Sequence, residues 1–312
     1  MANRSLARAG LWSLLLCLAP LLQDRLALAA GGGVGDPGEG FLDGVRRRAA
    51  RLGSRPGRPS EPASEAAKEV AAKLSSVPLL RGFVLELLED SQVPLNLKRV
   101  VLTALLREEA VVLKLTEKVR REFGLMPELR AATLFNLYGF RTVSGTQAPP
   151  TLNQAVQAPS AAGPVDGKPT VLIEQRRRAE NGNDLMILMH ELAHVRFLAF
   201  MERRIGRLAD RLPEGQVRRA ADGKYEMNVQ LWDFLFERYA YQIEYETFLA
   251  TNGRYYSELL GRFGPDVDSS NYRRAVADYV AHAYRITDPA VVSLRDRSLL
   301  EILLGADPTA SQ

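Results

Sequence analysis

Apolar side chains recur every three or four residues through most of the chain beyond residue 64, which is the spacing of amphipathic helices. Within residues 64–143 this pattern is interrupted at Pro78, Pro94, Gly124 and Pro127. Proline and glycine end or kink helices, so we expect a bundle of four or five helices here.

The second half of the chain adds one strand pattern to long helical ones. Residues 170–174 (TVLIE) are rich in β-branched side chains and predict a strand, with residues 141–144 as a candidate partner. Helical spacing returns over residues 183–205, 226–251 and 272–285. The sequence therefore predicts a mainly α protein of the α+β class, in which a helical bundle precedes a domain with a small sheet and long helices.

Two stretches rich in Gly, Pro, Ala and Ser separate these regions. Residues 30–63 have a composition that cannot bury a core and predict a disordered linker. Residues 144–168 predict a second linker or a long surface loop. The expected division is then a helical domain at 64–143 and a second domain at 169–312.

The N-terminus has the three parts of a secretory signal peptide. Arg4 and Arg8 supply positive charge, residues 11–22 form an apolar segment, and residues 27–29 (ALA) supply small side chains for cleavage. The apolar segment is shorter than the ~20 residues that span a bilayer. We expect cleavage after Ala29 and export to the bacterial periplasm or the medium, with an uncleaved membrane tether as the alternative.

The composition of the chain limits which ligands and which kinds of site are expected. Loss of residues 1–29, which hold three arginines and one aspartate, lowers the net charge from +4 to +2. So small an excess does not indicate nucleic-acid binding, which needs a clustered basic face. The single cysteine, Cys17, lies in the removed segment, so the mature chain forms neither disulfides nor cysteine metal sites. No stable membrane span is expected after cleavage.

The motif MHELAHV stands inside the predicted helix 183–205. His190 and His194 are four residues apart, so both side chains project from one helical face and can bind the same metal ion. Glu191 can take a proton from a water molecule that the metal activates. Zinc suits imidazole and carboxylate ligands in a hydrolytic site. Two surface histidines are the alternative, but the neighbouring side chains from 187 to 195 are otherwise uncharged.

This motif resembles the active-site helix of the zincin metallopeptidases. The resemblance implies that His190 and His194 bind Zn²⁺, that Glu191 is the general base, and that the substrate is a peptide or protein. Arg196 departs from the extended pattern, in which an apolar residue is usual. The resemblance is close over about 15 residues around the motif and weaker over the rest of the C-terminal half.

A catalytic zinc site needs a third protein ligand. Residues 195–204 hold no further histidine, so the ligand must come from elsewhere. Glu237 and Glu244 share one face of the predicted helix 226–251 with Ala240. This arrangement resembles the gluzincins, in which a glutamate on a second helix completes the site. Glu237 is our first choice as ligand; Glu244 is the second, as ligand or as acceptor for a ligating histidine.

The only other histidine, His282, is a candidate to stabilise the oxyanion, and Tyr279 or Tyr284 can do the same. Asp278, one turn earlier, can orient His282. By resemblance to the zincin edge strand, residues 170–174 are expected to pair with an extended substrate.

The function expected from the sequence is an exported zinc metallopeptidase. Two alternatives stay open: a non-catalytic zincin-like binding module, and a zymogen with residues 30–143 as its propeptide.

Overall fold

The structure of the chain is a computed structural model that describes residues 65–125, 129–144, 164–175, 183–251, 267 and 270–305. The expected signal peptide, the linker 30–63 and most of the second linker lie outside the described residues. Within the described residues, none of the helices has the length and apolar character that crossing a membrane requires.

Helices make up most of the described chain, in agreement with the predicted class. They are α3 (Glu65–Lys73), α4 (Pro78–Glu89), α5 (Leu95–Leu102), the π-helical turn η1 (Thr103–Arg107), α6 (Glu117–Glu122), the 3-10 turn η2 (Val165–Gly167), α8 (Asn183–Leu208), α9 (Val229–Ala250), α11 (Tyr272–Ala283), α12 (Pro289–Val292), the 3-10 turn η3 (Ser293–Asp296) and α13 (Leu299–Leu304). The three long helices predicted in the second half are therefore confirmed as α8, α9 and α11.

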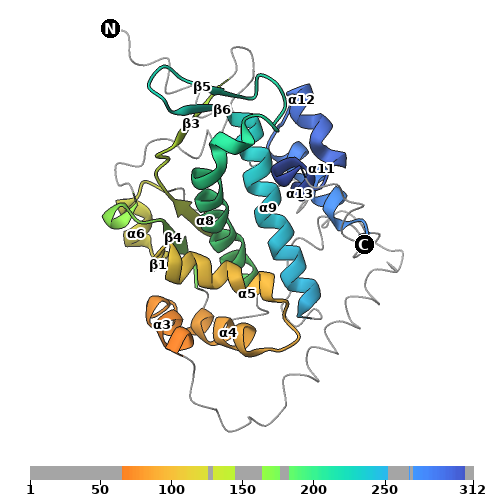
Figure 1. Cartoon of the computed structure of the whole chain (residues 1–312). Helices are drawn as coiled ribbons and strands as arrows, with labels where there is room; N and C mark the ends of the chain where they lie inside the picture. Colours follow the sequence, from red (N-terminus) through yellow and green to blue (C-terminus); the bar gives the residue numbers. More distant parts are fainter. Residues whose placement is uncertain are drawn as a thin grey trace, which may run out of the picture.

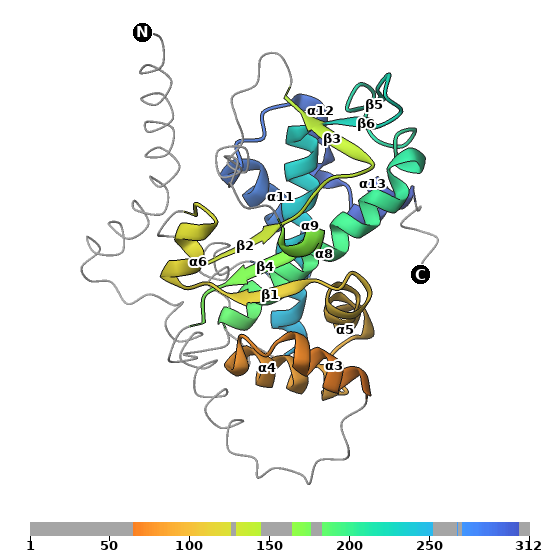
Figure 2. The same ribbon diagram turned by 90° about the vertical axis from the view of Figure 1, so that its left-hand side faces the viewer.

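The first sheet has the order β1-β4-β2 and lies against α8, as Figure 2 shows. Its strands are β1 (Val111–Lys114), β4 (Thr170–Ile173) and β2 (Ala131–Leu134). β1 runs parallel to β4 and β2 runs antiparallel to it. The predicted strand at 170–174 is confirmed as β4, and all four of its residues are buried.

Two expectations for this part of the chain are wrong. Residues 64–143 are not helical throughout, because β1 and β2 fall inside them. These four-residue strands are held by pairing with β4, a non-local interaction that local periodicity does not record. β4 is also the central strand with both edges occupied, so it cannot pair with a substrate.

The second sheet has the order β3-β6-β5. β3 (Phe140–Val143) pairs in parallel with β6 (Tyr225–Asn228), which pairs antiparallel with β5 (Val217–Arg219). The segment 141–144 was expected to join the strand at 170–174, and its true partner is β6. Phe140, at the start of β3, is fully buried against Trp232 of α9.

Helices α8 and α9 lie side by side through the middle of the molecule (Figure 1). Residues 185–195 of α8 share one apolar cluster with residues 240–248 of α9. Residues 197–208 of α8 share the other large cluster with residues 231–236 of α9. The two helices are therefore antiparallel, and the two clusters meet near the middle of each helix.

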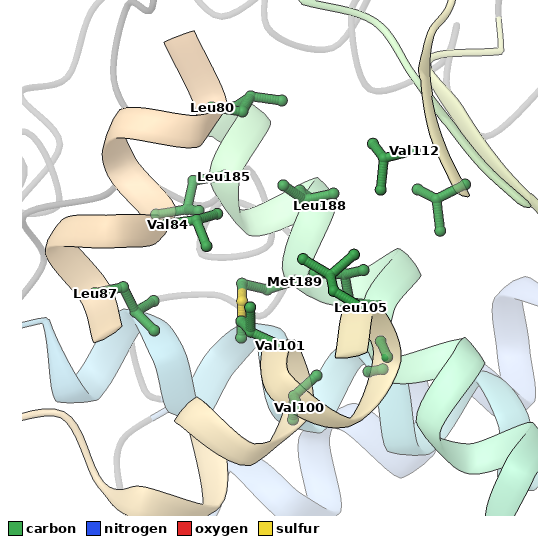
Figure 3. Packing of buried hydrophobic residues seen from close by; sticks show 14 of the residues in the cluster. Leu80, Val84, Leu87, Val100, Val101, Leu105, Val112, Leu185, Leu188 and Met189 are labelled. Carbon is green, nitrogen blue, oxygen red and sulfur yellow. The ribbon is translucent and has the colours of Figure 1, made fainter. Parts of the chain in front are cut away.

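Figure 3 shows the first of these clusters, in which α4 and α5 cover the N-terminal half of α8. Leu80 and Val84 of α4 and Val101 of α5 pack with Leu185 and Met189 of α8, all fully buried. Side chains from both predicted domains thus form one continuous core around the helix that carries the motif.

Buried polar contacts fix the segment after α11 against α9. Oε1 of Gln230 accepts hydrogen bonds from the backbone N–H groups of Thr287 and Asp288, both at 2.8 Å. The guanidinium of Arg238 donates to the carbonyl oxygens of Leu294 and Arg297 at 3.0 and 2.7 Å. These bonds hold residues 287–297, which follow α11, against the first half of α9.

Candidate metal centre

His190, His194 and Glu237 meet where the two apolar clusters join. The two histidines lie one turn apart on α8, and Glu237 faces them from α9. Nε2 of His190 is 3.4 Å from Oε2 of Glu237, and Nε2 of His194 is 3.7 Å from Oε1 of the same carboxylate. All three residues are buried, and their potential ligand atoms lie within 4.8 Å of one another.

These separations fit a single metal ion. Two donor atoms that each lie ~2.1 Å from a tetrahedral zinc ion are about 3.4 Å apart. The observed separations of 3.4 and 3.7 Å between the histidine nitrogens and the Glu237 oxygens are close to this value. The described residues therefore include a buried His/His/Glu group that can bind a metal ion, as the sequence predicted for these three positions.

Glu244 orients the first histidine. Its Oε2 lies 3.3 Å from Nδ1 of His190, on the opposite side of the ring from Glu237. A carboxylate at Nδ1 keeps a proton on that nitrogen and leaves the lone pair of Nε2 for a metal. Of the two roles that the sequence left open for Glu244, the geometry favours the acceptor role, while Glu237 takes the ligand position.

The second histidine is held by an aromatic ring. Phe236 stacks on His194, with 3.9 Å between ring centroids and 17° between the planes. Burial lowers the pKa of His194 to about 3, so the imidazole stays neutral, as a metal ligand must be. Nδ1 of His194 is buried without a hydrogen-bond partner in the described residues.

The buried carboxyl groups at the site favour the binding of a cation. Glu191, Glu237 and Glu244 bring three buried carboxyl groups to His190. Burial lowers the pKa of His190, but hydrogen bonds to Glu237 and Glu244 outweigh that effect and raise the pKa to about 10. In the absence of a metal ion, protonated His190 balances part of this negative charge, because a buried charge needs an opposite partner.

Glu191 lies outside the ligand group and has a partner of its own. The Thr133 hydroxyl, on β2, donates a 2.6 Å hydrogen bond to Oε2 of Glu191. Burial raises the pKa of Glu191 to about 7, although His190 and the hydrogen bond from Thr133 act in the opposite direction. A carboxyl group whose pKa lies near neutrality is suited to exchange protons with a substrate.

Two tyrosines border the site on the side of α11. The Tyr284 hydroxyl donates to Oε2 of Glu237 at 2.8 Å and lies 3.4 Å from the Tyr241 hydroxyl. The Tyr241 ring packs edge-on against His190, with 4.5 Å between centroids. Burial raises the pKa of Tyr284 well above its ordinary value, so this hydroxyl keeps its proton.

The position of His282 does not support the role expected for it. Its side chain is exposed on α11, whereas Tyr284, two residues later, is buried at Glu237. Residues two apart near a helix end point to different sides, so only one of them can face α9. Asp278 contacts Arg274 at 2.8 Å and Arg295 at 3.3 Å, which replaces the expected contact with His282.

Two contributors were missed by sequence reasoning. Thr133 lies in strand β2, which the spacing of apolar residues did not predict. The sequence therefore gave no indication that Thr133 contacts Glu191. Phe236 stands next to Glu237 in the chain, and nothing in the sequence distinguished a ring that stacks on a histidine from an ordinary core residue.

Comparisons with known proteins identify no family for this chain. No protein-family model matches the chain, and no similar curated protein or solved structure was found.

Proposed function

We propose that the protein is a zinc-dependent metallohydrolase that cleaves peptide bonds, with His190, His194 and Glu237 as metal ligands and Glu191 as general base. The observation that carries the proposal is the convergence of these three buried side chains, from two helices, on the space of one ion beside Glu191. A zinc site with three protein ligands keeps a fourth position for reaction.

Two nitrogen donors and one carboxylate favour zinc over the harder Mg²⁺ and Ca²⁺, which prefer oxygen ligands alone. When bound, zinc would supply a Lewis acid that polarises a carbonyl group and makes water more acidic.

Proton transfer and hydrogen bonding to the substrate are assigned to side chains of the protein. Glu191 takes a proton from water and returns it to the leaving amine, and its carboxylate is oriented for this by Thr133. The Tyr284 hydroxyl donates to Glu237 and so holds that carboxylate in place. The neighbouring Tyr241 hydroxyl is placed to donate a hydrogen bond to a substrate oxygen. Of the residues that the sequence offered for this role, Tyr284 is bonded to Glu237 and His282 is exposed.

A peptide substrate is favoured by the strand next to Glu191. In the described part of the chain, β2 pairs with β4 on one side and with no strand on the other. All four β2 residues are half-buried, unlike the fully buried β4. An extended peptide can add to such an edge through main-chain hydrogen bonds. β2 thus replaces β4 as the strand that would receive substrate.

Export is part of the proposal and rests on the N-terminal sequence alone. The signal-like segment at 1–29 supports a periplasmic or extracellular enzyme acting on peptides or proteins rather than on nucleic acid.

A non-catalytic binding module is the second candidate, and the zymogen hypothesis is the third. The zymogen hypothesis requires removal of residues 30–143, which include β1, β2 and Thr133. Their loss would leave β4 without either neighbour and Glu191 without its hydrogen bond. We therefore favour the form that keeps this segment.

The test compares the purified wild-type chain with Glu191→Gln and with Glu69→Gln, a control at an exposed glutamate of α3. Zinc content and cleavage of a fluorogenic protein substrate are measured together. The proposal expects one zinc per chain in all three, and a loss of about 10²–10⁴ in kcat in Glu191→Gln only. Zinc binding with no cleavage by the wild type would favour the binding module.

A further inference from the structure

Phe135 directly follows the edge strand β2, and its ring lies beside the candidate metal centre. The ring packs against Phe236 and Trp232 of α9, with 5.4 and 6.2 Å between ring centroids. Phe236 in turn stacks on the proposed ligand His194, with 3.9 Å between centroids. One aromatic ring therefore separates Phe135 from a residue that holds the metal.

Thr133 and Phe135 direct their side chains to the same side of β2. Successive side chains of a strand alternate between its two faces, so residues two apart share a face. The contacts agree with this rule, because Thr133 reaches Glu191 of α8 and Phe135 reaches α9. Leu134, between them, packs in a separate apolar cluster with Leu172 of β4. The face of β2 that contacts the proposed general base thus also carries the Phe135 ring.

The main-chain groups of Ala131 and Thr133 point to the free edge of β2. In an antiparallel pair, residues bonded to the partner strand alternate with residues whose N–H and C=O groups point away from it. The N–H of Glu174 donates to the carbonyl oxygen of Arg130 at 2.8 Å, so Arg130 and every second residue after it face β4. Thr133 therefore presents its N–H and C=O groups to an added strand, and the substrate residue across from it faces Glu191.

The metal centre lies between the levels of Thr133 and Phe135 along β2. β2 and α8 run in the same direction, because Arg130 contacts Asp184 at 3.2 Å and Thr133 contacts the proposed general base, which lies further along α8. His194 stands about one turn beyond the general base in that direction, toward Phe135. The scissile bond of a bound peptide then lies between the residue across from Thr133 and the residue across from Phe135.

We propose that Phe135 is a specificity-determining residue that contacts a large apolar side chain of the substrate, aromatic in preference to aliphatic. The inference rests on the proposed peptidase function. The recognised side chain belongs to the first or second residue on one side of the scissile bond. Contact with the half-buried Phe135 ring removes apolar surface from water, and an aromatic side chain adds a favourable ring–ring contact.

The experiment profiles cleavage of a peptide library by the full chain and by its Phe135→Ala, Phe135→Leu and Phe83→Ala variants. Phe83 is the matched control, because it is also a half-buried phenylalanine but packs on the first apolar cluster from α4. The wild type and Phe83→Ala should prefer a large apolar residue at the first or second position on one side of the cleaved bond. Phe135→Ala should reduce that preference at least tenfold in kcat/KM, while Phe135→Leu should still accept aliphatic residues and lose the preference for aromatic ones.

The ratio of kcat/KM between peptides is the decisive readout, because a merely structural role for Phe135 would lower the cleavage of all peptides alike. Phe135→Leu, the milder exchange, keeps the test decisive if Phe135→Ala does not fold, which a thermal melt reveals. Cleavage without an apolar preference at those positions, a preference for lysine or arginine there, or an apolar preference that the folded Phe135 variants retain overturns the inference and leaves the peptidase proposal intact. Failure of the wild type to cleave any member of the library overturns both.

Discussion

The hydroxyl of Thr133 donates a 2.6 Å hydrogen bond to the carboxylate of Glu191. It links the edge strand β2 to the helix that carries both histidines, so the position of the proposed general base depends on a strand far away in sequence.

Replacing Thr133 by valine should reduce kcat by about ten- to a hundredfold while zinc content is unchanged. Valine keeps the shape of threonine but removes the donor, and a hydrogen bond to a charged group contributes about 1.5–3 kcal/mol. Thr133→Ser should retain most of the activity. Steady-state kinetics of both variants, with Thr142→Val on β3 as control, measures this. Full activity in Thr133→Val would show that Glu191 needs no support from β2.

Glu244→Gln should weaken zinc binding by about 10–100-fold, the usual effect of losing the partner of a metal-bound histidine. Glu237→Ala should weaken it further, because a direct ligand is lost. Competition with a chromophoric chelator gives both affinities. Glu246→Gln, on the same helix but bonded to Tyr272 and Gln242, is the control and should bind zinc normally. The reverse order for Glu244 and Glu237 would exchange the roles assigned to them.

Zinc affinity should fall as the pH falls. In the absence of metal, hydrogen bonds to Glu237 and Glu244 raise the pKa of His190 to about 10. Below that pH, Nε2 of His190 carries a proton that zinc must displace. The burial-lowered pKa of His194, about 3, adds no such proton at neutrality. Zinc binding should weaken about tenfold per pH unit, hence about 100-fold from pH 8 to pH 6. Titration by calorimetry in buffers of different ionisation enthalpy counts the released proton, and no release at pH 7 would contradict the expectation.

Removal of zinc should destabilise the protein, because the ion neutralises buried carboxylates at the junction of α8 and α9. A ligand present at 100 times its Kd stabilises by about 2.7 kcal/mol, which corresponds to roughly 5–10 °C in Tm for a chain of this size. Differential scanning calorimetry with and without chelator measures the shift. His194→Ala, which lacks a ligand, should show no chelator-dependent shift, and an equal shift in both proteins would locate the stabilising metal elsewhere.

What the sequence could predict was set by the range of the interactions. His190 and His194 are four residues apart on one helix, so their convergence follows from local geometry. Glu237 could be ranked first because it shares a helical face with the small residue Ala240 on a second long helix. β1 and β2 escaped prediction because only their pairing with β4 makes them strands. Whether His282 or Tyr284 approaches the site depended on which side of the end of α11 faces α9, a tertiary contact that no local pattern records.

The most direct test of the central claim is a crystal structure of the zinc-loaded protein with an anomalous difference map at the zinc absorption edge. The account predicts one strong peak about 2.0–2.2 Å from Nε2 of His190, Nε2 of His194 and a carboxylate oxygen of Glu237, with Glu191 outside the coordination sphere. No peak at saturating zinc, or a peak that Glu237 does not coordinate, would contradict it.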